Sequence, residues 1–371
     1  MGAASPNRFR AFAVALAVAM IAIALDVGLG KLVPDGSVRQ LLMLTACNAL
    51  VAVSLNVING MAGQFSIGHA GFVGVGAYTA AIVASHLHTR MGGGDPTLLR
   101  SFLVVPPAIL AAAAIAGVAG LLLGLPSLRL RGDYLAIVTL GFAEIFRLTI
   151  ASAPSGATSG AFSIARLGGS NGYAGVDGQG VPLYAGPFWI VGVAVIGCVL
   201  AWRLKFSSWG RALRALREDE IAAASVGIDP TRYKVTSFVI AAIGGGVAGA
   251  LLALMRDGAP VQQPDGFGFL LSFDAITMVI LGGSGSVTGS ILGAVFVTLS
   301  IKAIELAQSA PAVQALRGPH HWGPIELTLD LNALRMIVYA IVVVALMVLR
   351  PEGLLGEREL FARRSAARGA T

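Results

Sequence analysis

Residues 203–234 read RLKFSSWGRALRALREDEIAAASVGIDPTRYK, a charged segment in a chain whose mean hydropathy is +0.80. The segment contains seven Lys/Arg and four Asp/Glu residues, and apolar runs flank it at about 187–202 and 235–256. A basic loop between two membrane spans favours the cytoplasmic side. The segment therefore indicates a protein that crosses a membrane several times and has a structured cytoplasmic loop suited to docking a partner.

The composition of the whole chain agrees with this interpretation. Of its 371 residues, 56% are apolar and 12% are charged, against roughly 25% charged in an average soluble domain. The apolar residues come in runs of about 17–25, the length at which a helix crosses a hydrocarbon core. The 48 glycines suit helices that approach one another closely in lipid. We predict an all-α, polytopic transmembrane helical bundle.

The apolar runs predict about ten spans. The first follows Arg8 and Arg10 and extends to about Leu25. It resembles a signal peptide, but no clear small-residue cleavage site follows it, so we expect an uncleaved span. The other nine are expected at residues 38–58, 64–86, 101–125, 134–153, 187–202, 235–256, 270–284, 289–308 and 332–349.

The distribution of Lys and Arg orients these spans. With both termini in the cytoplasm, the arginines at 129–131, the 203–234 loop and the Arg-rich C-terminus all lie inside, as membrane proteins favour. This arrangement needs two crossings within 270–308, although the run GGSGS at 282–286 interrupts that stretch.

Two short helices are expected within the charged loop. Three arginines recur at i, i+3 and i+6 from Arg211, so they share one helical face. Three acids suit the N-terminal turn of a second helix, over about 219–226. Gly227 can adopt the left-handed conformation that stops a helix, and Pro230 cannot continue one.

The third apolar run begins GMAGQFSIGHAGFVGVG at Gly60 and is unusually rich in glycine. Each glycine costs about 1 kcal/mol of helix propensity, so an ordinary lipid-facing helix is disfavoured. An interrupted helix that lines a polar cavity would explain the run and its polar residues Gln64, Ser66 and His69. Close helix packing, with His69 bonded to a neighbour, would explain it equally.

Ionisable residues inside predicted spans are candidates for function, because they are costly in lipid. Glu144 and Arg147, and likewise Lys302 and Glu305, have opposite charges at i,i+3 and can neutralise each other on one helix face. Asp274 has no base nearby in sequence, so we expect a partner on another helix or a place near the outer end of its span. Glu144, Arg147 and Asp274 join Gln64, Ser66 and His69 as candidates for a translocation path.

Several classes of protein are disfavoured. The net charge of +7 comes from basic residues beside the spans, without the aromatic-interleaved grooves of nucleic-acid binding. Cys47 and Cys198 lie far apart in apolar runs, so neither a disulfide nor a zinc site is expected. The sequence contains no GxxxxGK[ST] phosphate loop and no catalytic or metal-ligand spacing. We expect neither an enzyme nor a cofactor bound by this chain.

Several motifs resemble the branched-chain amino-acid permease family of ABC importers, in particular its LivM-type membrane subunit. The core Ala222, Ala223 and Gly227 resembles the cytoplasmic coupling loop of ABC importer permeases. The likeness extends from about residue 50 to 356. Besides the charged loop it includes LNVINGMAGQFSIGHAGFVGVGAYTAA (55–81), LPSLRLRGDYLAIVTLGFAEIFRL (125–148), SFDAITMVILGGSGSVTGSILGA (272–294) and LRPEGLLG (349–356).

The resemblance implies one permease domain, residues 1–356, with its coupling loop at 203–234, and a basic cytoplasmic tail at 357–371. It implies a bacterial inner-membrane importer of branched-chain amino acids with a second homologous permease, two ABC ATPases that use ATP and Mg²⁺, and a periplasmic or extracellular solute-binding protein. By the same resemblance, residues 218–227 dock into the ATPase and transmit its closure. The residues implied in this coupling are Glu218, Asp219, Glu220, Ala222, Ala223 and Gly227.

The sequence departs from the family pattern in two places, and alternatives stay open. Ile221 separates Glu220 from the two alanines, and a longer outer segment at 309–330 contains His320, His321 and Trp322. Urea, short-chain amides or other amino acids are alternative solutes within the family. An ion-coupled secondary transporter is the alternative from another class, disfavoured by the structured loop, and a scaffold would leave the polar glycine-rich run unexplained.

Overall fold

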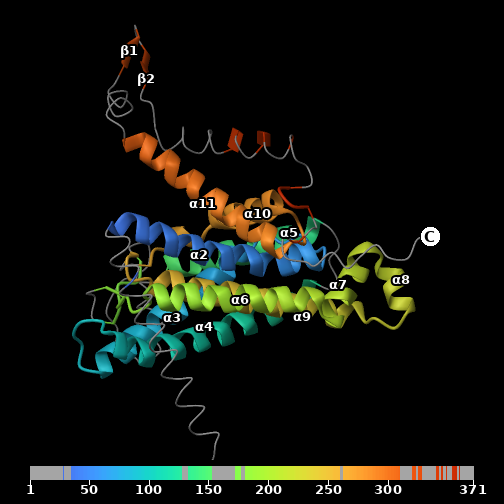
Figure 1. Ribbon diagram of the computed structural model, residues 1–371, viewed down its shortest axis with the longest axis horizontal. Coiled ribbons are helices and arrows are strands. Elements are labelled where there is room, and N and C mark those ends of the chain that lie inside the picture. The colour runs from blue at the N-terminus through green and yellow to red at the C-terminus, as the bar shows by residue number, and fades with distance from the viewer. Residues whose placement is uncertain are drawn as a thin grey trace, which may run out of the picture.

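Figure 1 shows the computed structural model of the protein, a bundle of long helices. The structure describes residues 35–127, 133–152, 172–176, 180–259, 262–309, 320–322, 325–327 and 353–356, with single residues at 28, 340–341, 344–345, 348 and 359. Its elements are α2 (Gly36–Asn56), the π-helical turn η1 (Val57–Met61), α3 (His69–Arg90), α4 (Leu98–Ser127), α5 (Asp133–Ala151), α6 (Pro187–Phe206), α7 (Ser208–Glu218), α8 (Glu220–Ser225), α9 (Pro230–Leu254), the 3-10 turn η4 (Pro264–Phe267), α10 (Phe269–Gly282), α11 (Val287–Ser309), β1 (His320–Trp322) and β2 (Ile325–Leu327).

Eight helices in the described part of the chain are long and apolar enough to span a membrane. They correspond to the second to ninth predicted spans, so the multi-pass helical architecture is confirmed. The first predicted span and most of the last, at 332–349, fall outside the described residues, and the total of ten stays a prediction. The helix α10 has only 14 residues, but η4 before it extends the apolar segment to 19 residues.

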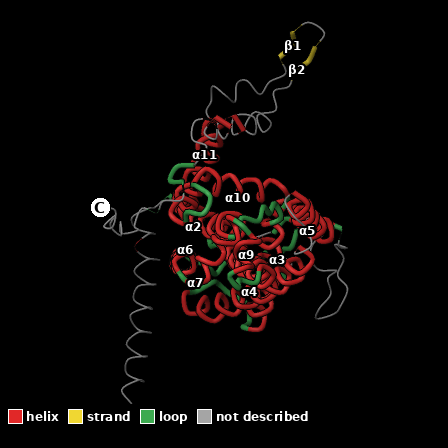
Figure 2. The backbone as a smooth tube through the Cα atoms, turned by 90° about the vertical axis from the view of Figure 1, so that its right-hand side faces the viewer, coloured by secondary structure: helices red, strands yellow, loops and turns green. Residues whose placement is uncertain are grey.

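Helix α9 lies at the centre of the bundle. Figure 2, which looks along the helices, shows it between α2, α3, α4 and α6, and all four contact it. Small residues on α9 allow this close packing: a Cβ on Gly249 would collide with the Val73 carbonyl of α3, and one on Gly246 with Ala116 of α4. Helix α9 begins five residues before the predicted span, because Asp229 caps it and Pro230 fits its first turn.

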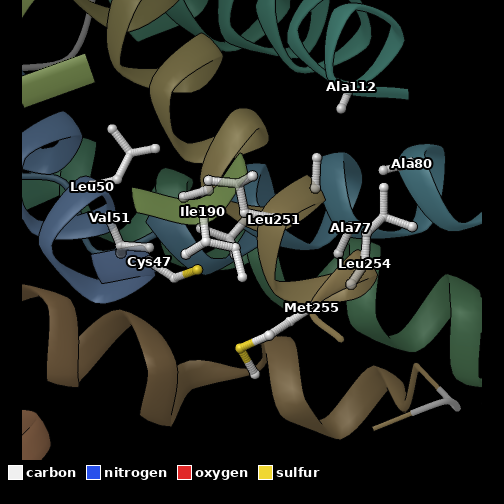
Figure 3. Packing of buried hydrophobic residues seen from close by; sticks show 14 of the residues in the cluster. Cys47, Leu50, Val51, Ala77, Ala80, Ala112, Ile190, Leu251, Leu254 and Met255 are labelled. Carbon is white, nitrogen blue, oxygen red and sulfur yellow. The ribbon is translucent and has the colours of Figure 1, made fainter. Parts of the chain in front are cut away.

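The main hydrophobic core lies between α2, α3, α6 and α9. Figure 3 shows Leu251 of α9 and Ile190 of α6 beside Cys47 and Leu50 of α2, whereas Leu254 of α9 lies toward Ala77 of α3. All these side chains are buried. By contrast, most of the outward-facing residues of α4, α5 and α6 are exposed apolar side chains, as expected of helices that face lipid.

The connections between helices segregate to two ends of the bundle. One end carries α7 and α8 (Figure 1), together with the turn between α10 and α11. Residues 353–356 return to this end, because Leu354 and Leu355 donate to the carbonyls of Leu281 and Gly282 at the end of α10. At the opposite end Arg39 pairs with Asp257 at 2.6 Å, and His88 bonds Tyr184 at 2.7 Å. This segregation agrees with the predicted order of crossings, including the two within 270–308.

Two features differ from the sequence prediction. The predicted span 64–86 starts as a helix only at His69, because an irregular segment at 63–68 follows η1. The all-α fold class is confirmed, and the structure adds one short hairpin that the sequence did not predict, in which β1 and β2 pair antiparallel with His320 opposite Leu327. This hairpin lies within the outer segment 309–330, where the sequence shows no helical hydrophobic period.

Candidate functional site

The docking loop, which we define as residues 207–229, consists of α7, α8 and their capping residues. The Ser207 side chain accepts a hydrogen bond from the Gly210 N–H at the start of α7. Asp219 then caps α8 by accepting from the Ile221 and Ala222 N–H groups at 2.8 and 3.0 Å. Gly227, at φ +87°, ends α8 in the left-handed conformation. The second short helix predicted at 219–226 is therefore confirmed, with its stop.

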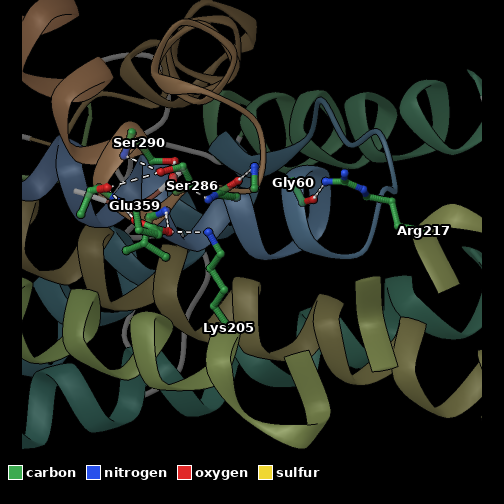
Figure 4. Close-up of polar contacts among 11 residues, drawn as sticks. Gly60, Lys205, Arg217, Ser286, Ser290 and Glu359 are labelled. Carbon is green, nitrogen blue, oxygen red and sulfur yellow. Dashed lines mark hydrogen bonds and ion pairs between the residues drawn. The ribbon is translucent and has the colours of Figure 1, made fainter. Parts of the chain in front are cut away.

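The base of the docking loop is attached to the C-terminal segment through a buried ion pair. Lys205 Nζ, at the end of α6, lies 2.5 Å from Glu359 Oε1, and the two side chains are only 7% and 2% exposed. Glu359 also accepts from the N–H groups of Val287 and Thr288, the first residues of α11, at 2.8 and 3.0 Å. One carboxylate thus caps α11 and neutralises the cation beneath α7, as Figure 4 shows.

The hydrogen bonds of Glu359 also set its protonation. Burial alone raises the pKa of this carboxyl, but the bonds from Lys205, Thr288 and Val287 outweigh burial and hold the pKa below its usual value of 4.5. Glu359 is therefore ionised at neutral pH, and its attachment to α6 and α11 is electrostatically intact there.

A second contact joins α7 to the end of α2. Arg217 Nη1 donates to the Gly60 carbonyl within η1 at 2.8 Å (Figure 4). Glycines make room for this side chain: a Cβ on Gly63 would collide with Arg217 Cγ, and one on Gly285 would lie 3.2 Å from Nη1. A cavity of about 30 Å³ remains beside Arg217 and Lys205, with room for about one water molecule.

The tip of the docking loop is exposed, whereas its base is buried. Ile221 and Val226, on and just after α8, are 83% and 75% exposed. Glu218 is also exposed, Glu220 pairs with Lys234 at 2.6 Å, and Ala223 is buried. Ala222 is exposed as well. The sequence-predicted coupling residues therefore fall into an outward face and a set that shapes the loop, namely Asp219, Ala223 and Gly227.

The broken helix, which we define as residues 57–69, contains three of the translocation-path candidates. Gln64 is buried and lies 3.5 Å from the Ser237 hydroxyl of α9. His69 Nε2 shares a hydrogen bond of 2.8 Å with Ser54 of α2. Among the described residues, no partner lies within hydrogen-bonding distance of His69 Nδ1 or Ser66 Oγ, although both side chains are fully buried. Unpaired polar atoms are costly in the interior of a membrane protein, so these two atoms call for an explanation.

The glycines of this run also mediate close packing. A Cβ on Gly68 would collide with the Thr139 carbonyl of α5, and one on Gly76 with the Gly246 carbonyl of α9. In addition, Asn59 bonds both the N–H and the carbonyl of Ser66, at 3.1 and 3.2 Å. The structure thus shows an interrupted helix and tight helix contacts, with His69 bonded to Ser54 of a neighbouring helix. A polar cavity lined by this run stays a prediction.

Glu144 and Arg147 pair on α5, as their i,i+3 spacing predicts, at 2.8 Å. Arg147 also pairs with Asp265 of η4 at 2.8 Å, and Glu144 accepts from the Phe269 N–H at 3.2 Å. This network ties α5 to the start of α10. It lies on the same helix as Thr139, whose hydroxyl accepts from the Ile67 N–H of the broken helix at 3.1 Å. Asp265 was not a candidate in the sequence, because its partner is 118 residues away.

The remaining ionisable candidates lie apart from the broken helix in sequence. Asp274 is half-buried on α10, and Lys302 is half-buried on α11. Both take part in polar or electrostatic interactions. The side chain of Glu305 lies outside the described residues, so the predicted pairing with Lys302 stays a prediction.

Sequence reasoning missed the residues that connect the docking loop to the bundle. Lys205 and Arg217 are only two of seven basic residues in the charged segment, and Glu359 is one acid in the predicted tail. Nothing in the sequence therefore distinguishes these three residues from their charged neighbours. Asn56 was also missed. It is fully buried, its side chain accepts from the Gly285 N–H at 2.9 Å, and it donates to the Ser286 carbonyl at 3.1 Å. A buried amide in a predicted span was the one available signal.

The fold and the site define a multi-pass helical membrane protein with a structured loop at one end and a polar break inside the bundle. Comparison with family models matches residues 37–347 to the family described as branched-chain amino acid transport system / permease component. The chain belongs to this family of transport permeases.

Curated relatives agree with the family match. The chain is 35% identical over 343 residues to the high-affinity branched-chain amino acid transport system permease protein LivM of Salmonella typhimurium strain LT2, covering 87% of this chain and 71% of that protein. It is 35% identical to LivM of Escherichia coli K12, covering 84% and 68%. It is 27% identical to the ribose import permease protein RbsC of Haemophilus influenzae, covering 73% and 77%. No solved structure gives a significant match.

Proposed function

We propose that this chain is one membrane subunit of an ATP-driven ABC importer that carries branched-chain amino acids across a bacterial inner membrane. The chain forms the pathway together with a second, homologous permease. A periplasmic or extracellular binding protein delivers the solute, and two cytoplasmic ATPases, which hold the ATP and Mg²⁺, drive the cycle. Both termini and the docking loop lie in the cytoplasm, and the chain itself catalyses no reaction.

The observation that carries this proposal is the docking loop, with a fixed base and an open apolar tip. Its sequence is basic, as cytoplasmic loops are. Ile221 and Val226 are exposed apolar side chains, and such surface suits contact with a partner protein. Asp219 and Gly227 hold the short helix α8 in a defined shape, so a partner would meet a preformed ridge rather than a flexible loop.

The solute is supported by the family and by the two LivM relatives, whose printed names specify branched-chain amino acids. The ribose permease relative covers a similar share of the chain at lower identity. The solute screen must therefore include sugars as well as urea, short-chain amides and other amino acids.

The test begins with affinity purification of the chain from its native membrane in mild detergent, with mass spectrometry of the subunits that copurify. We expect a second permease and an ATPase with a phosphate-binding loop. The purified complex is then placed in liposomes with the associated binding protein, and uptake of labelled leucine, isoleucine and valine is measured with and without ATP. Recovery of the chain alone, with uptake that follows an ion gradient and ignores ATP, would favour the secondary transporter.

A further inference from the structure

The contact between the docking loop and the broken helix bears on how a movement of the loop could reach the polar interior. The π-helical turn η1 ends α2, and Ala62 bonds back to the Val57 carbonyl in the wider π pattern. Turns of this kind are rare and concentrate at functional sites, because the wider turn interrupts regular helical bonding. The Gly60 carbonyl in this turn accepts the guanidinium of Arg217 instead.

Three observations indicate that this contact is built into the fold rather than incidental. Arg217 is half-buried and its bond to Gly60 joins positions 157 residues apart. Gly60, Gly63 and Gly285 surround its path, and a side chain at any of them would collide with or crowd a neighbour there. Gly63 also has φ +67°, a conformation that other residues rarely adopt.

The broken helix continues from this contact directly to the unpartnered polar atoms. Asn59, next to Gly60, holds Ser66 by both its main-chain groups. Three residues beyond Ser66, His69 is the first residue of α3. Its Nδ1 atom has no hydrogen-bond partner among the described residues. A displacement of Gly60 would therefore move Ser66 through Asn59, and the Ser66 hydroxyl and His69 ring would change their surroundings together.

We infer that Arg217 is the positioning residue through which movement of the docking loop shifts the broken helix and the polar atoms of Ser66 and His69. This role rests on the proposed function, because the ATPase supplies the movement. Leu213 and Leu216 of the same helix are buried, and Leu213 belongs to the same buried cluster as Val57 and Ile58 of η1, so α7 is packed directly against this turn. The bond from Arg217 to the Gly60 carbonyl then converts movement of α7 into movement of the α2 end.

The experiment uses the whole importer, with this chain, its partner permease, the ATPases and the binding protein, in liposomes. Solute uptake per ATP hydrolysed is measured for wild type, Arg217→Ala and Arg217→Lys. Arg211→Ala is the matched control, because Arg211 lies on the same helix, is exposed and is not among the residues that line the cavity beside Arg217. We expect Arg217→Ala to lower uptake per ATP hydrolysed roughly tenfold, as loss of a charge-assisted hydrogen bond implies. Arg217→Lys should restore part of the uptake, and Arg211→Ala should match wild type.

A local measurement separates positioning from general structural support. Ser66→Cys, in a background with Cys47→Ala and Cys198→Ala, reports labelling of the broken helix by a small thiol reagent. We expect the labelling rate to change between the ATP-bound and nucleotide-free importer, and this change to disappear when Arg217→Ala is added. An ATP-dependent change that persists in the Arg217→Ala protein would overturn the inference, as would Arg217→Lys that assembles but transports no better than Arg217→Ala.

The outcomes for the proposed function are distinct. A wild-type complex that fails to couple ATP hydrolysis to uptake would contradict the importer itself and this role with it. A coupled wild type with an equally coupled Arg217→Ala would contradict only the role of Arg217.

Discussion

The base and the tip of the docking loop differ in almost every physical respect. At the base, Lys205 and Arg217 are withdrawn from solvent and bonded to segments far away in sequence. At the tip, Ile221 and Val226 are open, and the bonds of α8 are local caps. The difference shows that contacts with the bundle determine the position of the docking loop, whereas local contacts within the loop determine the conformation of α8. Loss of the buried ion pair at the base should therefore lower stability, and changes at the tip should lower coupling. Arg217 is the one base residue inferred to affect coupling as well, because it also bonds the broken helix.

The largest expected effect is at the base. Glu359→Ala removes the carboxylate that caps α11 and lies 2.5 Å from Lys205. Breaking a buried ion pair costs about 3 kcal/mol, because a charge stays buried with less compensation. The measurement is thermal unfolding of the detergent-solubilised protein. Glu218→Ala is the control, since this exposed acid makes only a 3.4 Å contact with Arg217, and it should change stability by less than about 0.5 kcal/mol. Equal effects of the two changes would contradict the comparison.

The next effect is at the tip and concerns coupling. Gly227→Val places a β-branched residue at φ +87°, which costs roughly 1–2 kcal/mol locally, although the space around the position is open. The C-terminal end of α8 should reshape, so that solute-stimulated ATP hydrolysis falls while the protein still inserts. Gly227→Asn is the control, since asparagine tolerates this conformation and should keep most of the stimulation. Normal hydrolysis in the valine variant would mean that the shape of α8 does not matter to the ATPase.

A smaller structural effect is expected at Glu220, whose bond to Lys234 is partly exposed. Glu220→Lys should cost less than about 1 kcal/mol of stability, yet lower solute-stimulated ATP hydrolysis, because it reverses the charge that α8 presents. The charge swap Glu220→Lys with Lys234→Glu tests this reason. A swap that regains normal hydrolysis would assign the defect to the lost pair within this chain rather than to contact with a partner.

The smallest effect is the pH dependence of the base. Because the folded-state pKa of Glu359 lies below 4.5, its stabilising contribution is complete above about pH 4.5 and declines as the pH falls through the lower folded value. The stability difference between wild type and Glu359→Gln should stay constant from pH 7 to 5 and shrink below 4.5. Thermal unfolding across this range measures it, and a difference that disappears already near pH 6 would show that Glu359 is protonated there.

Local sequence patterns predicted much of the architecture. Each of the eight described spans lies within a few residues of its predicted run, because a span needs a long apolar stretch whatever its neighbours are. The helix α8 and its stop at Gly227 were predicted because capping depends on residues within one turn. The start of α3 was misplaced, because the helix at 64–68 is interrupted by bonds from Asn59 and Thr139, which no periodicity in the run reveals.

The sequence by itself indicated that this protein spans a membrane with helices and has a basic, capped loop. Those properties come from composition, run length and turns, and all of them are local. The likeness to a permease family came instead from motifs that resemble that family along most of the chain, and the family match agrees with it. Only the tertiary structure decided that Arg217 binds the end of α2 and that Glu359 caps α11 beside Lys205. These contacts join residues 157 and 154 positions apart, and they exist because helix packing brings three separate segments to the same end of the bundle.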